Sequence, residues 1–317
     1  MATFWGVDSL TPIDHVIDAK HNKTLFDVVC EHCDRVPAFW GRYLNGHDHR
    51  KKVKNKIVGA NLNLTAKEAA YVFQASKGVT RILPIYVPVK ASVGSTKQQG
   101  LIDAGRAIAA ADNLQIPNGV FLWADIEPEW TTSPEWLRGW WEGMFTSRFG
   151  GCGGIYEDPR ETNGSSFAWA YADAIQQTED MSPTSSASQA EQASTLGGAV
   201  YEFFNPQPPS TAIQEQFSKK MKPWQQANFK KGLRDHPIPQ AEMPALRHYL
   251  WSQRPTQANI KDLKSTPAYA PVRPYRVSDS TMIWQYAIDC LHLGGGKNGL
   301  IDMNVATEQG LETMWKI

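Results

Sequence analysis

Eight short apolar segments, each bounded by glycine, proline or polar residues, constrain the fold of this 317-residue chain more than any other feature. They lie at residues 4–7, 39–44, 81–87, 120–126, 154–156, 248–252, 282–286 and 300–305. Segments of this length and composition are typical of buried strands. Eight such strands, with helical patterns between several of them, predict an α/β fold, a closed (β/α)8 TIM-type barrel.

The segments between the strands carry helix signals. Thr65 and Glu68 predict a capping box that opens a helix over residues 66–77. Residues 100–114 are rich in alanine, and Ser133 followed by proline predicts the start of a further helix. This alternation favours parallel strands joined by right-handed crossovers.

The spacing of the strands is uneven, because residues 160–243 are polar and much longer than an ordinary barrel connection. We therefore predict one barrel domain over residues 1–317, with an insertion after the fifth strand at about residues 160–243. We expect this insertion to be partly helical, mobile around residues 182–194, and to hold an added strand at 199–204. The basic runs at 219–234 and 47–56 predict solvated surfaces rather than a nucleic-acid site.

Composition excludes several classes of protein. The 32 Lys and Arg residues balance 32 Asp and Glu residues, which gives no attraction to nucleic acid or to an anionic membrane. No apolar run is long enough to span a bilayer. The first residues lack the pattern of a signal peptide, so we expect a protein that is cytoplasmic as synthesised and released, if at all, by a non-classical route or by lysis.

The four cysteines are too few for a disulfide framework. Cys30 and Cys33 have no second pair at zinc-site spacing, so we interpret them as buried thiols rather than metal ligands. The glycine-rich run at residues 294–296 lacks the spacing of a phosphate-binding loop. We therefore predict neither a metal nor another cofactor.

The strongest chemical signal is the pair Asp125 and Glu127. Alternate residues of a strand share a face, and Pro128 ends the strand, so both acids should lie at its carboxyl end. Active sites of TIM barrels form at that end. Two neighbouring carboxyl groups raise one another's pKa, and a proton donor beside a charged carboxylate is what glycosidic cleavage requires. The alternative is an acidic strand end that only faces solvent.

Other strand ends add to this pair. Asp8 ends the first strand, and Asp302 lies on the last, which neighbours the first in a closed barrel. We expect both to join Asp125 and Glu127 at one mouth. Aromatic and amide side chains at comparable positions would line it: Tyr86, Tyr156, Trp251, Trp284 and Gln285. Acids, aromatic rings and amides together suggest a sugar site, although clustered carboxylates also suit Mg²⁺ or Ca²⁺. The 12 Trp, 12 Phe and 10 Tyr residues suit a sugar cleft and equally a large aromatic core.

With these motifs in order along nearly the whole chain outside the insertion, the sequence resembles the glycoside-hydrolase-like domain of unknown function that is related to the family-25 muramidases, lysozyme-type barrels. The matching pieces are Gly6-Val7-Asp8-Ser9, Gly41-Arg42-Tyr43-Leu44, Leu83-Pro84-Ile85-Tyr86, Gly100 with Asp103-Ala104, Asp125-Ile126-Glu127, Gly154-Ile155-Tyr156, Trp284-Gln285-Tyr286 and Ile301-Asp302-Met303-Asn304. The resemblance implies that Glu127 is the general acid and that Asp125 assists cleavage. Within these motifs Arg42 is a further candidate for substrate binding.

The leading hypothesis is an O-glycoside hydrolase that cleaves a carbohydrate polymer, most plausibly the glycan strand of peptidoglycan. Glu127 would protonate the leaving oxygen, and Asp125 would stabilise the oxocarbenium-like state or orient a substrate N-acetyl group. Asp8 and Asp302 would bind hydroxyls and set the pKa values of the pair. The alternatives are a catalytically inactive barrel that binds carbohydrate or a partner, and metal-assisted hydrolysis at the acidic mouth.

Overall fold

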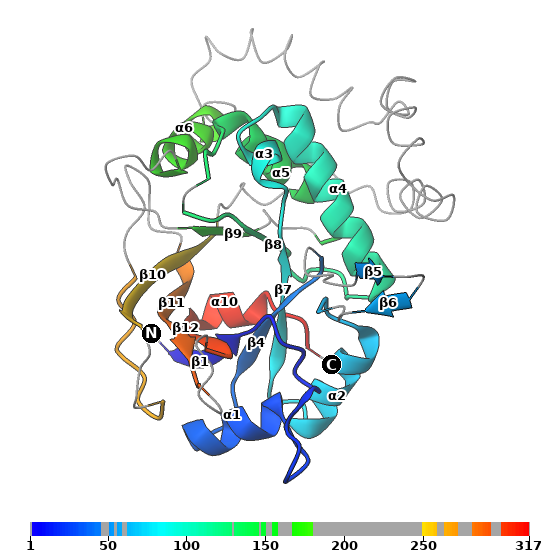
Figure 1. Cartoon of the computed structure of the whole chain (residues 1–317). Coiled ribbons are helices and arrows are strands. Elements are labelled where there is room, and N and C mark those ends of the chain that lie inside the picture. The colour runs from blue at the N-terminus through cyan, green and yellow to red at the C-terminus, as the bar shows by residue number, and fades with distance from the viewer. Residues whose placement is uncertain are drawn as a thin grey trace, which may run out of the picture.

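Eight strands close into one barrel in the computed structural model, which describes residues 2–45, 51–53, 56–58, 62–128, 130–145, 147–149, 154–157, 167–179, 249–258, 263–271, 281–292 and 299–316 (Figure 1). In chain order the barrel strands are β1 (Thr3–Asp8), β4 (Phe39–Tyr43), β7 (Arg81–Tyr86), β8 (Trp123–Asp125), β9 (Gly154–Glu157), β10 (Leu250–Ala258), β11 (Thr281–Cys290) and β12 (Ile301–Thr307). Each overlaps a segment that the sequence predicts to be a strand, although β8 is shorter than predicted and β10 and β11 are longer. The closed α/β barrel is confirmed.

One strand runs against the others. Strands β1, β4, β7, β8, β9, β10 and β11 follow one another in parallel, whereas β12 pairs antiparallel with both β11 and β1. Only ten residues separate Cys290 from Ile301, which is shorter than a crossover between parallel strands requires. Because β12 is reversed, its amino end lies beside the carboxyl end of β1, and Asp302 is the register partner of Asp8.

The helices lie outside the first strands of the barrel (Figure 1). They are α1 (Leu25–Cys33), α2 (Ala66–Ala75), α3 (Lys90–Val93), α4 (Lys97–Asn113), α5 (Pro134–Phe145) and α6 (Phe167–Glu179). The three helices expected from the sequence are present as α2, α4 and α5. Thr65 accepts a hydrogen bond from the Glu68 backbone N–H at 3.1 Å, and Ser133 accepts one from the Trp136 backbone N–H at 3.3 Å.

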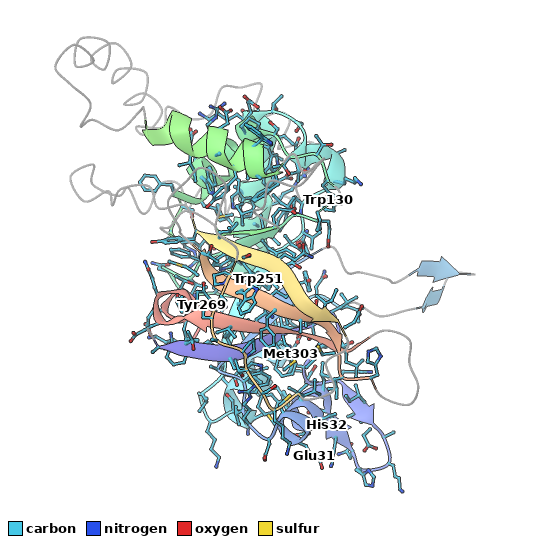
Figure 2. All side chains as sticks on the ribbon, turned by 90° about the vertical axis from the view of Figure 1, so that its left-hand side faces the viewer. Glu31, His32, Trp130, Trp251, Tyr269 and Met303 are labelled. Carbon is cyan, nitrogen blue, oxygen red and sulfur yellow. The ribbon has the colours of Figure 1, made fainter. Side chains whose placement is uncertain are left out.

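Two short ribbons extend the connections between barrel strands: β2 (Val16–Asp18) with β3 (Lys23–Thr24), and β5 (Lys51–Val53) with β6 (Lys56–Val58). The basic run at residues 47–56, which the sequence predicts to be a solvated surface, thus contains β5 and the first residue of β6. This β5–β6 ribbon stands away from the barrel in Figure 2.

The apolar core has two layers, one inside the barrel and one between the strands and the helices. The inner layer includes Phe39, Leu83, Ile85, Trp123, Trp251 and Ile283. The outer layer includes Val7, Trp40, Ala124, Trp136, Trp140 and Trp284. Both faces of the strands are therefore buried, as is usual for parallel strands covered by helices.

The end of the barrel opposite Asp8 is closed by the C-terminal helix α10 (Glu308–Glu312), which lies within the outline of the strands in Figure 1. Leu311 and Met314 belong to the inner layer of the core. Ile82 and Trp315 exchange two backbone hydrogen bonds of 2.9 Å, and Arg81 donates to the Leu311 carbonyl at 2.7 Å. A site inside this barrel is therefore reached from the carboxyl ends of the parallel strands.

Helix α6 falls within the insertion that the sequence predicts at residues 160–243. The segments expected there to be mobile (182–194), to form a strand (199–204) or to form a basic surface (219–234) lie outside the described residues. Among the helices that the structure describes, none has both the length and the apolar character needed to cross a bilayer.

Candidate functional site

Three aspartates from different strands lie at the open end of the barrel. Asp8 is the last residue of β1, Asp125 is the last residue of β8, and Asp302 is the second residue of β12. Each alternates with residues of the outer core layer, so each side chain points to the barrel axis. Asp8 and Asp125 are almost completely buried, and Asp302 is half-buried.

Glu127 stands at the rim of this group. Strand β8 ends at Asp125, one residue before the end of the predicted segment 120–126. The chain stays beside β9 for one more residue, because the Ile126 N–H donates to the Tyr156 carbonyl at 3.0 Å. Ile126 is buried in the outer layer, which puts Asp125 and Glu127 on the inner side. Glu127 is half-buried, and its own carbonyl accepts the Trp130 N–H at 2.9 Å as the chain turns towards α5.

Amide and aromatic side chains connect the aspartates. Asn304 donates to Asp8 Oδ2 at 2.7 Å, and Trp251 Nε1 donates to Asn304 Oδ1 at 3.0 Å. Tyr156, whose ring packs edge-on against Trp251 with centroids 4.5 Å apart, donates from its hydroxyl to Gln285 Oε1 at 2.7 Å. Figure 2 shows Trp251 on the strands of the barrel.

The remaining donors of this network reach Asp302 and Asp125. Gln285 donates to Asp302 Oδ2 at 3.1 Å, and the Asp289 backbone N–H donates to Asp302 Oδ1 at 2.8 Å. A hydrogen bond joins Tyr43 to Asp125. Asp125 Oδ1 is buried and has no hydrogen-bond partner among the described residues.

Burial and mutual repulsion shift the acids towards their protonated forms. Burial raises the pKa of Asp8 to about 6, although hydrogen bonds from Asn304 and Gln285 oppose that rise. Burial, and then the charge of Asp8, raise the pKa of Asp302 to about 8. The pKa of Asp125 lies well above its usual range, because of burial and then of the charge on Glu127. The cluster therefore holds protons near neutral pH, as a site for general acid catalysis must.

Several of the predicted site residues thus share one mouth. Asp8, Asp125, Glu127 and Asp302 lie at this open end, and the buried side chains Tyr156, Trp251 and Gln285 belong to the hydrogen-bond network that connects the aspartates. Tyr43 and Asn304 complete the network but were not among the predicted site residues. Both lie in the motifs that carry the family resemblance, and strand alternation from Gly41 and Asp302 would have placed them on the inner face.

Three predicted substrate-binding residues face away from the mouth. Tyr86 stacks on Trp140 of helix α5, with ring centroids 5.9 Å apart. Trp284 belongs to the outer layer and packs against Tyr269 and Tyr286. These two rings are therefore part of the helix–sheet interface, and their assignment to the sugar-binding wall is corrected.

Arg42 also points outwards and is completely buried in an ion pair with Glu68 of α2, with 2.6 Å between Nε and Oε1. It donates further to the backbone carbonyls of Ser9, Leu10 and Leu62. Its predicted contact with substrate is corrected, since its hydrogen bonds join the segment after β1 to the segment after β4 and to α2. Its charge still acts on the mouth, where it lowers the pKa of Asp8.

The residues that could bind a metal do not gather. Within the described part of the chain, no three side chains of His, Cys, Asp or Glu lie together in a way that could hold a metal ion. Cys30 and Cys33 are free thiols on α1, and burial raises their pKa to about 12 and about 11. Figure 2 shows His32, between them in sequence, far from the strand that carries Trp251.

Comparisons with known proteins identify the architecture and no activity. No protein-family model matches the sequence, and no curated protein matches it. The chain is similar to a crystal structure of an uncharacterized B. stearothermophilus protein, with 21% identity and a TM-score of 0.58 over 98% of this chain and 100% of that one. Two crystal structures of a Tat-secreted Mycobacterium tuberculosis protein, in complex with L-tartrate and with HEPES, show 12% and 11% identity, and TM-scores of 0.44 and 0.41. Both cover 96% of this chain and, respectively, 97% and 95% of their own. The first of these likenesses shows that this fold occurs in another solved protein.

Proposed function

We propose that this protein is an O-glycoside hydrolase of the muramidase-related type and that it cleaves the glycan strand of a polymer such as peptidoglycan. The observation that carries the proposal is a half-exposed carboxyl group, Glu127, placed beside buried acids at the open end of a closed barrel. The choice of polymer follows from the resemblance of the ordered sequence motifs to the family-25 muramidases.

Glu127 is the general acid in this proposal, because it is the rim carboxyl that a glycosidic oxygen can approach. Asp125 supports the step from below by orienting the N-acetyl group of the sugar, since its raised pKa favours the protonated carboxyl group. An ionised carboxylate of the cluster attracts the positive charge that develops on the sugar. The buried acids therefore stabilise the transition state more than the bound substrate, which is the condition for electrostatic catalysis.

Asp8 and Asp302 bind sugar hydroxyls and set the pKa values of the pair. Their hydrogen bonds to Gln285 and Asn304 hold both carboxyl groups in place before substrate arrives. Tyr156 and Trp251, buried in the inner core layer, bond these two amides and hold them in place.

A second candidate function is a barrel that binds carbohydrate without cleaving it. The burial of Asp125 and Asp8, at 5% and 4% exposure, favours this alternative, because it limits how closely a substrate approaches them. Metal-assisted hydrolysis has less support, since the described acids are bonded to amides and to Tyr43 rather than grouped as ligands.

The decisive experiment compares Glu127→Gln with Glu308→Gln on purified peptidoglycan and measures new reducing ends. Glu308 is exposed on α10, at the closed end of the barrel, so its replacement is a matched control. Removal of a general acid should lower the rate by about 10²–10⁴, while the control keeps the parent's rate. Equal rates in the parent and Glu127→Gln would refute the assignment. Binding of wall oligosaccharides by a parent that releases no reducing ends would support the binding barrel instead.

A further inference from the structure

Two side-chain amides converge on Asp8 from neighbouring strands. Asn304 on β12 and Gln285 on β11 are register partners, and both point to the barrel axis. Asn304 Nδ2 lies 2.7 Å from Asp8 Oδ2, and Gln285 Nε2 lies 3.4 Å from the same oxygen. Gln285 Nε2 also lies 3.1 Å from Asp302 Oδ2, so one amide group serves both carboxyl groups. One oxygen of Asp8 thus faces two N–H donors.

The orientation of each amide is fixed by a second partner. The indole N–H of Trp251 can only donate, so the atom of Asn304 that faces it must be the oxygen. The NH₂ group of Asn304 must then face Asp8. Gln285 accepts the hydroxyl of Tyr156 on its oxygen, and the reversed orientation would place that oxygen against two carboxyl groups. Asn304 cannot turn without the loss of hydrogen bonds on both sides, and Gln285 cannot turn without the loss of its two donations to the carboxyl groups.

This arrangement favours a negative charge on Asp8. An oxygen whose lone pairs accept two N–H donors has no room for a proton on the side that faces them. Hydrogen bonds to a charged carboxylate are also stronger than hydrogen bonds to a neutral carboxylic acid. Asp125 differs: its Oδ1 has no partner among the described residues, and burial disfavours its charge. The structure therefore distinguishes the charge states that Asp8 and Asp125 favour.

We propose that Asn304 and Gln285 are positioning residues that hold Asp8 as the standing anion of the mouth, while the proton stays on Asp125. A standing anion faces the sugar throughout the reaction and stabilises positive charge on it; this catalytic role rests on the proposed function, whereas the charge state of Asp8 does not.

The other charged and titratable groups around Asp8 shift its pKa in directions that follow from their charges. Asp302 on β12 and the β8 acids Asp125 and Glu127 are negative when ionised, and Tyr156 on β9 is neutral. Arg42, on the outer face of β4, supplies positive charge that lowers the pKa of Asp8. Burial raises the pKa of Asp8 and of Asp302 above the usual range for aspartate, and it raises the pKa of Asp125 well above that range.

The test is an NMR titration of the protein labelled with ¹³C at the aspartate carboxyl carbons, with the Asp8 signal assigned by its loss in Asp8→Asn. In the parent we expect Asp8 to titrate near pH 6. Asn304→Leu keeps the side-chain volume but removes the donor, so the Asp8 midpoint should rise by about one pH unit or more. Gln285→Met is the second variant, should Asn304→Leu fail to fold, and it should raise the midpoints of both Asp8 and Asp302.

Two further variants separate positioning from a general disturbance. Trp251→Phe keeps a ring in place but frees Asn304 to turn, so it should also raise the Asp8 midpoint although Trp251 does not contact Asp8. Asn118→Leu, an exposed asparagine bonded to Arg148 before β8, should leave it unchanged. An Asp8 midpoint that stays near pH 6 in both Asn304→Leu and Gln285→Met would overturn the inference.

Activity gives an independent readout. If the parent cleaves peptidoglycan, the acidic limb of its pH–rate profile should move to higher pH in Asn304→Leu, together with the NMR midpoint. A midpoint that moves in a protein without hydrolase activity would sustain the inference and reject the proposed function. A parent that hydrolyses peptidoglycan, with an Asp8 midpoint that does not move in Asn304→Leu, would support the proposed function and reject the inference.

Discussion

Replacing Arg42 with methionine should destabilise the protein strongly although Arg42 is no substrate ligand. Its guanidinium is completely buried and pairs with Glu68, whose side chain is 1% exposed. It also donates to the carbonyls of Ser9, Leu10 and Leu62 at 2.6, 3.1 and 2.8 Å. Methionine fills much of the same volume but leaves a buried carboxylate without its cation. Breaking a buried pair in this way costs about 3–5 kcal/mol, so we expect a loss of that size in the free energy of unfolding.

A double variant tests the physical reason. Arg42→Met with Glu68→Leu removes both charges, and replacing a buried ion pair by apolar side chains is often close to neutral. The double variant should therefore be more stable than Arg42→Met alone. It should remain below the parent, because the Ile13 N–H and three carbonyls lose their partners.

Urea denaturation followed by tryptophan fluorescence measures all three proteins, with Lys23→Met as the control. Lys23 forms an ion pair with Glu31 of the same 2.6 Å length, but at the surface, where such pairs contribute about 0–1 kcal/mol. The reasoning fails if Arg42→Met is as stable as Lys23→Met. It also fails if the double variant is no more stable than Arg42→Met, since the uncompensated charge would then not be the cause.

Three further predictions concern the acids, the helix contact and the thiols. The folded-state pKa values of Asp8 and Asp302 are raised, so their contribution to the free energy of unfolding is largest below about pH 4 and is lost as pH rises through about 6 and about 8. For Asp8 alone, the free energy of unfolding that is lost by pH 7 is on the order of 3 kcal/mol. Urea denaturation should therefore give a lower free energy of unfolding at pH 8 than at pH 5, and Asp125→Asn should reduce that difference. Gly100→Ala should lower the melting temperature, because its Cβ would lie 2.1 Å from the Trp136 carbonyl oxygen and force α4 and α5 apart. Both thiols of α1 should react with iodoacetamide at pH 8 far more slowly in the folded protein than in urea, and equal rates would contradict their raised pKa values.

Much of the architecture followed from local patterns in the sequence. Each of the eight barrel strands begins or ends within a few residues of a predicted apolar segment, because short apolar runs between breakers have few other stable conformations. The starts of α2 and α5 followed from Thr65 and Ser133, whose side chains cap the first free N–H groups. Asp125 and Glu127 could be placed on one side of the chain because alternation is a local property of a strand.

Which face of a strand lies inside the barrel could not be read from alternation. Both faces of these strands are buried. The hydrophobic pattern of the sequence is therefore the same whether Ile85 or Tyr86, and Gln285 or Trp284, points into the barrel. The sequence therefore predicts Tyr86 and Trp284 at the mouth, whereas in the closed barrel both side chains point outwards into the outer core layer. The packing of the whole barrel decides this, because it fixes the side from which each strand is covered.

Strand direction and partner choice also depended on the tertiary structure. The short connection before β12 turns that strand back, and only this reversal brings Asp302 beside Asp8 at the open end. Glu68 was predicted to complete a capping box, but its carboxylate binds Arg42 and the Ile13 N–H instead. A buried arginine 26 residues earlier in the chain offers a stronger partner than the helix's own first N–H groups, and sequence alone does not show that the two will meet.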